Sequence, residues 1–107
     1  MKPNDYLVRF GQLDETSPAE HVRQRAYTLG GQQIRVVEFT RGMQHPEWCV
    51  RGHFGYMLEG SLEIEFDHGT IELNPGDGMI IPAGETHRHR PVLKSDRALM
   101  LLCEPSI

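Results

Sequence analysis

Four of the six histidines fall in two short windows that also hold other side chains able to bind metal ions or move protons. These histidines are His45 and His53 in the first window and His87 and His89 in the second. Residues two apart on an extended chain point to the same side. Glu47 and Cys49 form one such pair, and His87 and His89 form another. Imidazole, carboxylate and thiolate groups are all metal ligands, and histidine also transfers protons near neutral pH.

These side chains can act together only if the fold brings the two windows to one place. If the windows lie on adjoining strands of a closed sheet, their inward side chains converge in its interior. Burying a polar group without a partner costs a few kcal/mol. A metal ion, or bound water and ligand, would remove that cost. The pattern therefore predicts a polar, histidine-rich pocket inside a barrel.

The elements that would position the windows are short strands. Apolar and polar residues alternate over short runs that Gly, Pro, Asn and Asp separate. The runs are 34–39, 54–58, 62–66, 70–73, 79–81, 86–90 and 97–103. The turn at 67–69 predicts a hairpin between two of them. Many short, evenly spaced strands predict an all-β sandwich or barrel, with residues 1–107 in one domain.

One segment supports two interpretations. Ser17-Pro18-Ala19-Glu20 has the form of a helix capping box with proline at the first helical position. The alternation over residues 22–28 fits a strand equally well. We expect one helical turn at most, followed by a strand.

Chain length and net charge indicate which kinds of partner to expect. The 107 residues are 38% hydrophobic, which is enough for one core, but a chain this small buries only part of its surface. We therefore expect a homodimer that pairs through an end strand. The formal net charge is −4, and the charges are interspersed without a basic patch, so nucleic acid is not an expected partner.

The same composition bears on location. No apolar run is long enough to cross a bilayer, and residues 1–5 lack the apolar stretch of a secretory signal. The two cysteines of an unsecreted chain are expected to be reduced thiols. We expect a cytoplasmic protein without membrane contact.

A family resemblance lies in the second window. Gly76, Pro82, Gly84 and His87 follow one another with five, one and two residues between them. This spacing resembles the second motif of the cupin superfamily, the RmlC-like barrels. Pro91 stands where that motif has an asparagine three residues beyond the histidine.

The first window resembles the end of the first cupin motif, a hydrophobic strand closed here by residues 59–61. Counting back from Gly60 places His53 at the family's glutamate. Glu47 and Cys49 then stand where the family has two histidines. All three positions keep side chains that can donate to a metal ion, although the donor types differ.

The resemblance implies a jelly-roll barrel (a double-stranded β-helix) that holds one divalent ion, with zinc, iron, nickel or manganese as candidates. The implied ligands are His53, His87, His89, Glu47 and Cys49. His89 takes the place of His87 if residues 84–86 bulge by two residues. His45 is a reserve donor that an altered loop would swing inward.

Three functions fit these residues. In the first, the ion acts as a Lewis acid or redox centre on a small polar molecule, with the reaction unspecified. In the second, a metal-free barrel binds or senses a small ligand without catalysis. In the third, a metal-free isomerase or epimerase uses His53 or His87 as the base and Tyr56 as the acid. The cupin superfamily includes proteins of all these kinds, so the resemblance predicts the fold more narrowly than the function.

Overall fold

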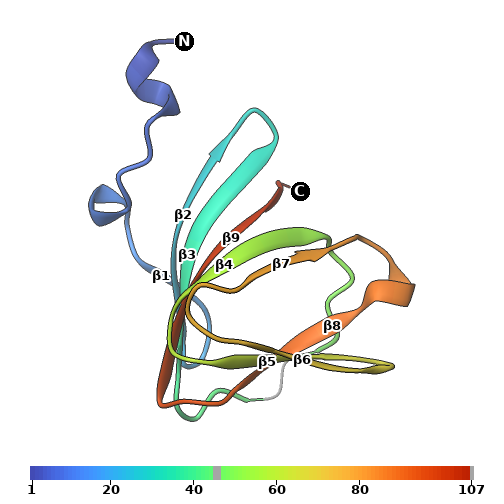
Figure 1. Ribbon diagram of the computed structural model, residues 1–107. Coiled ribbons are helices and arrows are strands. Elements are labelled where there is room, and N and C mark those ends of the chain that lie inside the picture. Colours follow the sequence, from blue (N-terminus) through green and yellow to red (C-terminus); the bar gives the residue numbers. More distant parts are fainter. Residues whose placement is uncertain (45–46, 107) are drawn as a thin grey trace.

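The computed structural model describes residues 1–44 and 47–106 as two antiparallel sheets that face one another (Figure 1). The larger sheet has the strand order β1-β2-β3-β9-β4-β7, and the smaller has the order β6-β5-β8. The strands of the larger sheet are β1 (Thr16–Ala19), β2 (Val22–Leu29), β3 (Gln32–Thr40), β4 (His53–Glu59), β7 (Gly78–Ile81) and β9 (Arg97–Pro105). Those of the smaller sheet are β5 (Leu62–Phe66), β6 (Gly69–Leu73) and β8 (His89–Leu93). The expected all-β jelly-roll is confirmed.

The described helical elements are three short 3-10 turns: η1 (Pro3–Tyr6), η2 (Phe10–Gln12) and η3 (Glu85–His87). The first two belong to an N-terminal arm that runs away from the barrel (Figure 1). The arm is tied to β2 by the Tyr27 hydroxyl, which donates to the Asp5 carbonyl at 2.8 Å. Within the described residues, no helix has the length and apolar character needed to span a bilayer.

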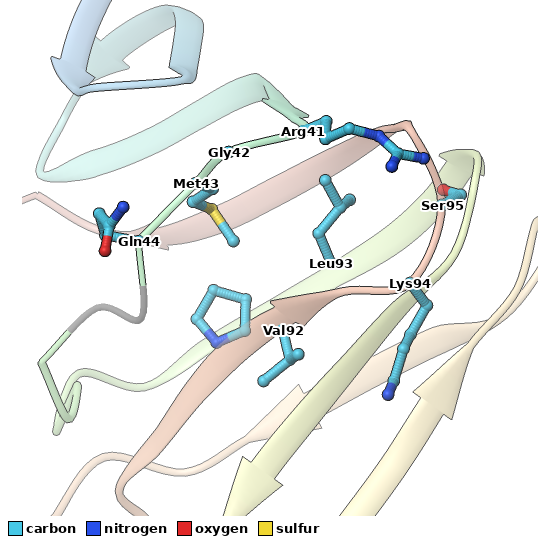
Figure 2. Close-up of a pocket in the computed structure, with 9 residues that line it drawn as sticks. Arg41, Gly42, Met43, Gln44, Val92, Leu93, Lys94 and Ser95 are labelled. Carbon is cyan, nitrogen blue, oxygen red and sulfur yellow. The ribbon is translucent and has the colours of Figure 1, made fainter.

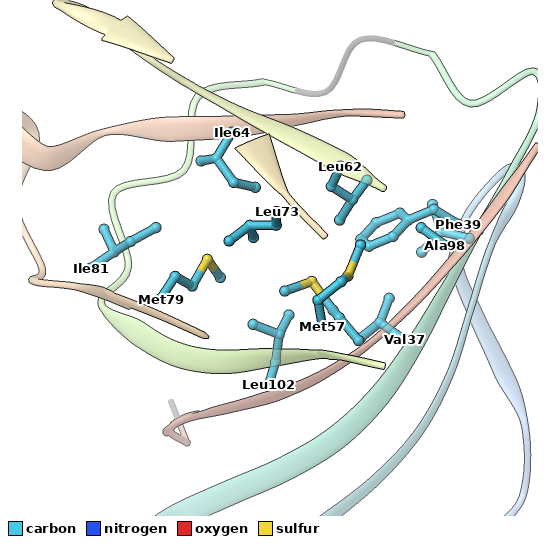
Figure 3. Close-up of a cluster of buried hydrophobic side chains, with 12 residues drawn as sticks. Val37, Phe39, Met57, Leu62, Ile64, Leu73, Met79, Ile81, Ala98 and Leu102 are labelled. Carbon is cyan, nitrogen blue, oxygen red and sulfur yellow. The ribbon is translucent and has the colours of Figure 1, made fainter. Parts of the chain in front are cut away.

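The core lies between the two sheets, because alternation along each strand sends every second side chain inward. Ala98, Met100 and Leu102 on β9 are at most 5% exposed. Figure 3 shows inward side chains of the larger sheet facing those of the smaller sheet, such as Leu62 and Ile64.

The expected helical turn after Ser17 is wrong. Residues Thr16–Ala19 form β1, which pairs with β2. The Ser17 hydroxyl lies 2.8 Å from the carbonyl oxygens of both Ala19 and Val22, so it closes the turn between two strands instead of capping a helix. His21 turns the chain with a φ of 63°. The strand expected after this point is confirmed as β2.

The 3-10 turn η3 replaces the first part of the extended run expected over residues 86–90. The amide of His87 donates to the Gly84 carbonyl at 3.1 Å, and the amide of Arg88 donates to the Glu85 carbonyl at 3.3 Å. The extended chain resumes only at His89, where β8 begins. As a result His87 is exposed and His89 is buried, so the two histidines do not share a face as the extended run predicted.

Gly60, in the turn between β4 and β5, offers a test of this packing. Its φ is +73°, and a Cβ there would overlap the Arg97 carbonyl oxygen. Gly60→Ala should therefore lower the free energy of unfolding by at least about 3 kcal/mol, as measured by urea denaturation. Gly31→Ala is the control, because Gly31 has a φ of +76° with no atom near its would-be Cβ and should lose only about 1–2 kcal/mol. Equal losses of unfolding free energy in the two variants would contradict the close packing of Gly60 against the Arg97 carbonyl.

Candidate functional site

A cavity of about 350 Å³ lies between the sheets, and residues of both sequence windows line it. Cys49 and His53 come from the first window, and His89 comes from the second. Glu47 also borders the cavity, as an exposed side chain. The described lining does not include His87. Of the two histidines that the sequence left as alternatives, His89 is the one that faces inward.

The centre of the site is a pair of imidazole rings, one from each sheet. His53 begins β4 and His89 begins β8. Their Nε2 atoms lie 2.8 Å apart, within hydrogen-bond distance, and the rings meet edge to face with centroids 4.8 Å apart. The His53 side chain is 9% exposed and His89 is 3% exposed. The pair is therefore shielded from bulk water while facing the cavity.

The hydrogen-bond partners fix the tautomers of the pair. The Nδ1 atom of His89 lies 3.0 Å from the His87 carbonyl oxygen. A carbonyl only accepts, so His89 carries its hydrogen on Nδ1 and offers a lone pair at Nε2. When both rings are neutral, His53 then donates its Nε2–H to His89. This leaves Nδ1 of a neutral His53 without a hydrogen, in keeping with its lack of a hydrogen-bond partner among the described residues. When the pair holds one more proton, Nδ1 of His53 can carry a hydrogen toward Glu104.

Behind His53 lies a buried carboxylate held by an arginine. Glu104 on β9 is 1% exposed, and its Oε1 accepts from Nε and Nη2 of Arg35 at 3.0 and 2.7 Å. The same Oε1 lies 3.9 Å from Nδ1 of His53. Burial raises the pKa of Glu104, but His53 and Arg35 outweigh it and hold that pKa below its usual value. An ionised carboxylate therefore faces the back of the histidine pair.

Cys49 lies on the other side of the pair, next to His89. The two residues form an isolated bridge in which each amide donates to the other's carbonyl, at 2.8 and 3.0 Å. The adjacent His89 ring lowers the pKa of the Cys49 thiol, although burial opposes it. Burial lowers the pKa of His89, but the Cys49 thiol and the His87 carbonyl outweigh it and leave that pKa raised.

Trp48 fixes the segment that carries Cys49. Its ring is half-buried, and the guanidinium groups of Arg88 and Arg90 lie over it, 4.7 and 4.2 Å from the ring centroid. The Nε–H of Arg88 is shared between both carboxylate oxygens of Asp67 at 3.0 Å, and Nη2 donates to Oδ1 at 2.8 Å. These contacts hold the first window against the smaller sheet.

The remaining candidates lie elsewhere. His87 is exposed in η3 and contributes its backbone carbonyl, not its ring, to the site. Tyr56 is 48% exposed and points to the opposite face of β4 from His53, so it cannot serve as the acid of this cavity. His45 lies outside the described residues.

Two residues of the site, Arg35 and Glu104, were not predicted from the sequence, although the alternation along their strands indicates them. Arg35 continues the inward positions Val37 and Phe39 on β3, and Glu104 continues Met100 and Leu102 on β9. A charged residue that continues an apolar face predicts a buried ion in need of a partner.

The described residues do not fit the divalent ion that the family resemblance implies. No group of three or more His, Cys, Asp or Glu side chains within residues 1–44 and 47–106 could hold a metal ion. The Nε2 atoms of His53 and His89 are hydrogen-bonded at 2.8 Å, whereas two imidazoles on one tetrahedral zinc ion would lie about 3.3 Å apart. Oε1 of Glu104 is already bound by Arg35.

A second hollow of about 360 Å³ lies beside residues 41–44 (Figure 2). Met43 and Gln44 border both this hollow and the cavity. Its two cations are compensated, because Arg41 pairs with Asp96 and Lys94 lies 3.5 Å from Glu63. No convergent set of reactive side chains comparable to the histidine pair lines its described surface.

Comparison with known proteins points to one fold. The family model described as Cupin domain matches residues 43–103. An RmlC-like cupin from Shewanella frigidimarina has a TM-score of 0.77 at 12% identity, covering 95% of this chain and 91% of that chain. A cupin-superfamily sugar phosphate isomerase from Silicibacter pomeroyi has a TM-score of 0.74 at 17% identity, covering 94% and 76%. KdgF from Halomonas has a TM-score of 0.68 at 20% identity, covering 91% and 90%. No curated protein matches the chain significantly.

The Glu104–Arg35 pair can be tested through stability. Glu104→Gln leaves Arg35 mostly buried without a counter-charge and should lower the free energy of unfolding by about 3 kcal/mol in urea denaturation. Because the folded state lowers the pKa of Glu104, the wild type's advantage is present above the usual carboxyl pKa. The difference in unfolding free energy between the wild type and Glu104→Gln should shrink as the pH falls through the lowered pKa of Glu104.

The control is Glu59→Gln, which removes an exposed partner of Arg97. That loss should stay below about 1 kcal/mol. Similar losses for the two variants would contradict a buried ion pair at the site.

Proposed function

Because this chain belongs to the cupin family, whose model matches residues 43–103, we propose that its cavity binds a small organic molecule and that His53 and His89 move a proton on it. The observation that supports this proposal is the Nε2–Nε2 hydrogen bond of 2.8 Å at the cavity wall. Two imidazoles in complementary tautomers place a proton donor and a proton acceptor side by side, which is the arrangement that acid–base catalysis needs.

The proposed reaction is proton abstraction from a carbon next to a carbonyl group. A carbonyl oxygen that enters between the rings accepts the Nε2–H of His53. The Nε2 lone pair of His89 is then free to take a proton from the neighbouring carbon. The C–H bond breaks, an N–H bond forms on His89, and the electron pair moves into an enol or enolate. Return of the proton to the same carbon restores the carbonyl compound, with hydrogen exchange at that carbon when the face is unchanged and epimerisation when it arrives on the opposite face.

Glu104 and Arg35 would support this step from behind. If His53 first takes a proton from solvent on Nδ1, the resulting imidazolium faces the Glu104 carboxylate 3.9 Å away, which stabilises it, and its Nε2–H becomes a stronger donor to the carbonyl oxygen. Arg35 keeps that carboxylate ionised and in place. Glu104 is thus a positioning residue, because it acts through His53 and does not line the cavity in the described structure.

Two alternatives from the sequence remain as proposals. Ligation of a divalent ion by His53, His87, His89, Glu47 or Cys49 stays a prediction for metal analysis, since the described geometry gives no step through such an ion. A non-catalytic binding or sensing module would use the same cavity without proton transfer. We also propose a cytoplasmic location, where Cys49 and Cys103 would remain free thiols as they are in the structure.

The test is hydrogen exchange on a panel of small ketones and aldehydes. The untagged protein is incubated with each compound in D₂O, and deuterium next to the carbonyl is followed by NMR. We expect exchange of at least one compound, with about a 10²- to 10⁴-fold loss in His53→Gln and in His89→Gln. His87→Gln, an exposed histidine in the same window, should retain full activity.

Two controls separate the alternatives. Elemental analysis and a chelator establish whether a metal ion takes part, and activity lost to chelator and restored by zinc or manganese would replace this proposal with the metal-dependent one. Binding without exchange on any compound would favour the binding module instead.

A further inference from the structure

The walls of the cavity are mostly apolar, and its polar groups gather around the histidine pair. The apolar lining includes Val37, Phe39, Ile64, Met79, Met100 and Leu102. The volume of about 350 Å³ is at the small end of ligand sites. Methionine side chains adapt to irregular apolar ligands. A ligand that fills this space must therefore present apolar surface to most of the wall.

The described lining of the cavity holds no arginine or lysine without a counter-charge, which an anionic ligand would need. Arg35 is the one such side chain in the described lining, its charge is matched by the buried Glu104 carboxylate, and three of its five N–H groups are already donated. Nε and Nη2 donate to Glu104, and Nη1 donates to Gln24 at 2.8 Å. A phosphate or carboxylate on the ligand would need a free guanidinium or ammonium group to offset its desolvation.

The border of the cavity adds negative charge. Glu20 and Glu47 both line it and are exposed, and the whole chain has a formal net charge of −4. Two carboxylates at an entrance disfavour the approach of an anion.

Building on the proposed function, we infer that the substrate is a neutral, largely apolar small molecule with one oxygen that meets the His53–His89 pair. This differs from the small polar molecule expected from the sequence. It also separates this chain from sugar phosphates, the substrate class named for the structurally similar Silicibacter isomerase. The apolar lining of the cavity, the pairing of Arg35 with Glu104 and the acidic border all support the same ligand class.

The test uses three probes that share one apolar ring: p-cresol, 4-methylbenzoate and 4-methylphenyl phosphate. Binding to the full chain is followed by NMR of ¹³C-methyl methionine. Met43, Met79 and Met100 line the cavity, whereas Met1 is 77% exposed in the arm and serves as the internal control. We expect p-cresol to shift the three cavity signals but not Met1, and both anions to bind at least about 100-fold more weakly.

The outcomes distinguish the inference from the function on which it rests. If either anion shifts the cavity signals at concentrations similar to p-cresol, the ligand class is overturned while a small-molecule cavity stands. If no probe shifts them and no carbonyl compound exchanges in D₂O, both are overturned. Glu104→Gln, which releases Arg35, should strengthen 4-methylbenzoate binding relative to p-cresol wherever that variant folds.

A separate observation concerns the outer face of the larger sheet. Ile80 is 85% exposed, Phe54 is 56% exposed and Tyr56 is 48% exposed. The register places Ile80 beside Phe54 and Phe54 beside Cys103, so these side chains form one continuous apolar row across β7, β4 and β9. A hollow of about 460 Å³ lies along the row, lined in part by Phe54, Ile80 and Cys103.

We infer that this row, with Tyr56 and Leu58 on the same face of β4, is the contact face between two copies of the chain. These exposed side chains offer on the order of 500 Å² of mostly apolar surface, which is more than half of the roughly 800 Å² per partner of a stable interface. The row itself contains no charged residue, and Arg51, which also lines the hollow, donates to the Pro105 carbonyl at 2.9 Å. Two copies can therefore pair about a two-fold axis along the row without a charged side chain at its centre.

Sedimentation and light scattering test this interface. The wild type should have twice the 12.2 kDa mass of one chain at micromolar concentrations, and Ile80→Glu should have the mass of one chain. Ile71→Glu is the matched control, because Ile71 is 40% exposed on β6 of the other sheet, and it should remain dimeric. A monomeric wild type at 100 μM, or a dimeric Ile80→Glu variant, would overturn the inference.

Discussion

The burial of one carboxylate governs how the polar end of the barrel is built. Glu104 continues an apolar face of β9 and is removed from water, where an unpaired charge would be very unfavourable. Arg35 on β3 supplies the counter-charge, and His53 on β4 lies on the other side. β9 runs between β3 and β4. The Arg35–Glu104 ion pair therefore joins β3 to β9 and faces His53 on β4.

The histidine pair is a product of the packing of two sheets. His53 belongs to the larger sheet and His89 to the smaller one, so their contact exists only when the sheets close over the core. Core residues such as Met57 and Leu62, both fully buried, hold the two sheets together. The packing of the core therefore helps to set the distance between the two rings.

Much of the fold could be predicted because its signals are local. The hairpin of β5 and β6 follows from alternation on either side of a short turn, and β4 and β7 follow from apolar runs that end at glycine or proline. The partnership of Arg35 and Glu104 could not be predicted, because the two residues are 69 positions apart and meet only through the pairing of β3 with β9. The choice of His89 over His87 depended on the 3-10 turn η3, in a segment whose sequence also suits an extended chain.

The clamp around Trp48 has a practical consequence. This is the only tryptophan of the chain, and it precedes Cys49, which lines the cavity. The guanidinium groups of Arg88 and Arg90 lie over its indole ring, within 4.7 Å of the ring centroid. The indole is thus an intrinsic fluorescent reporter one residue away from a side chain that lines the cavity.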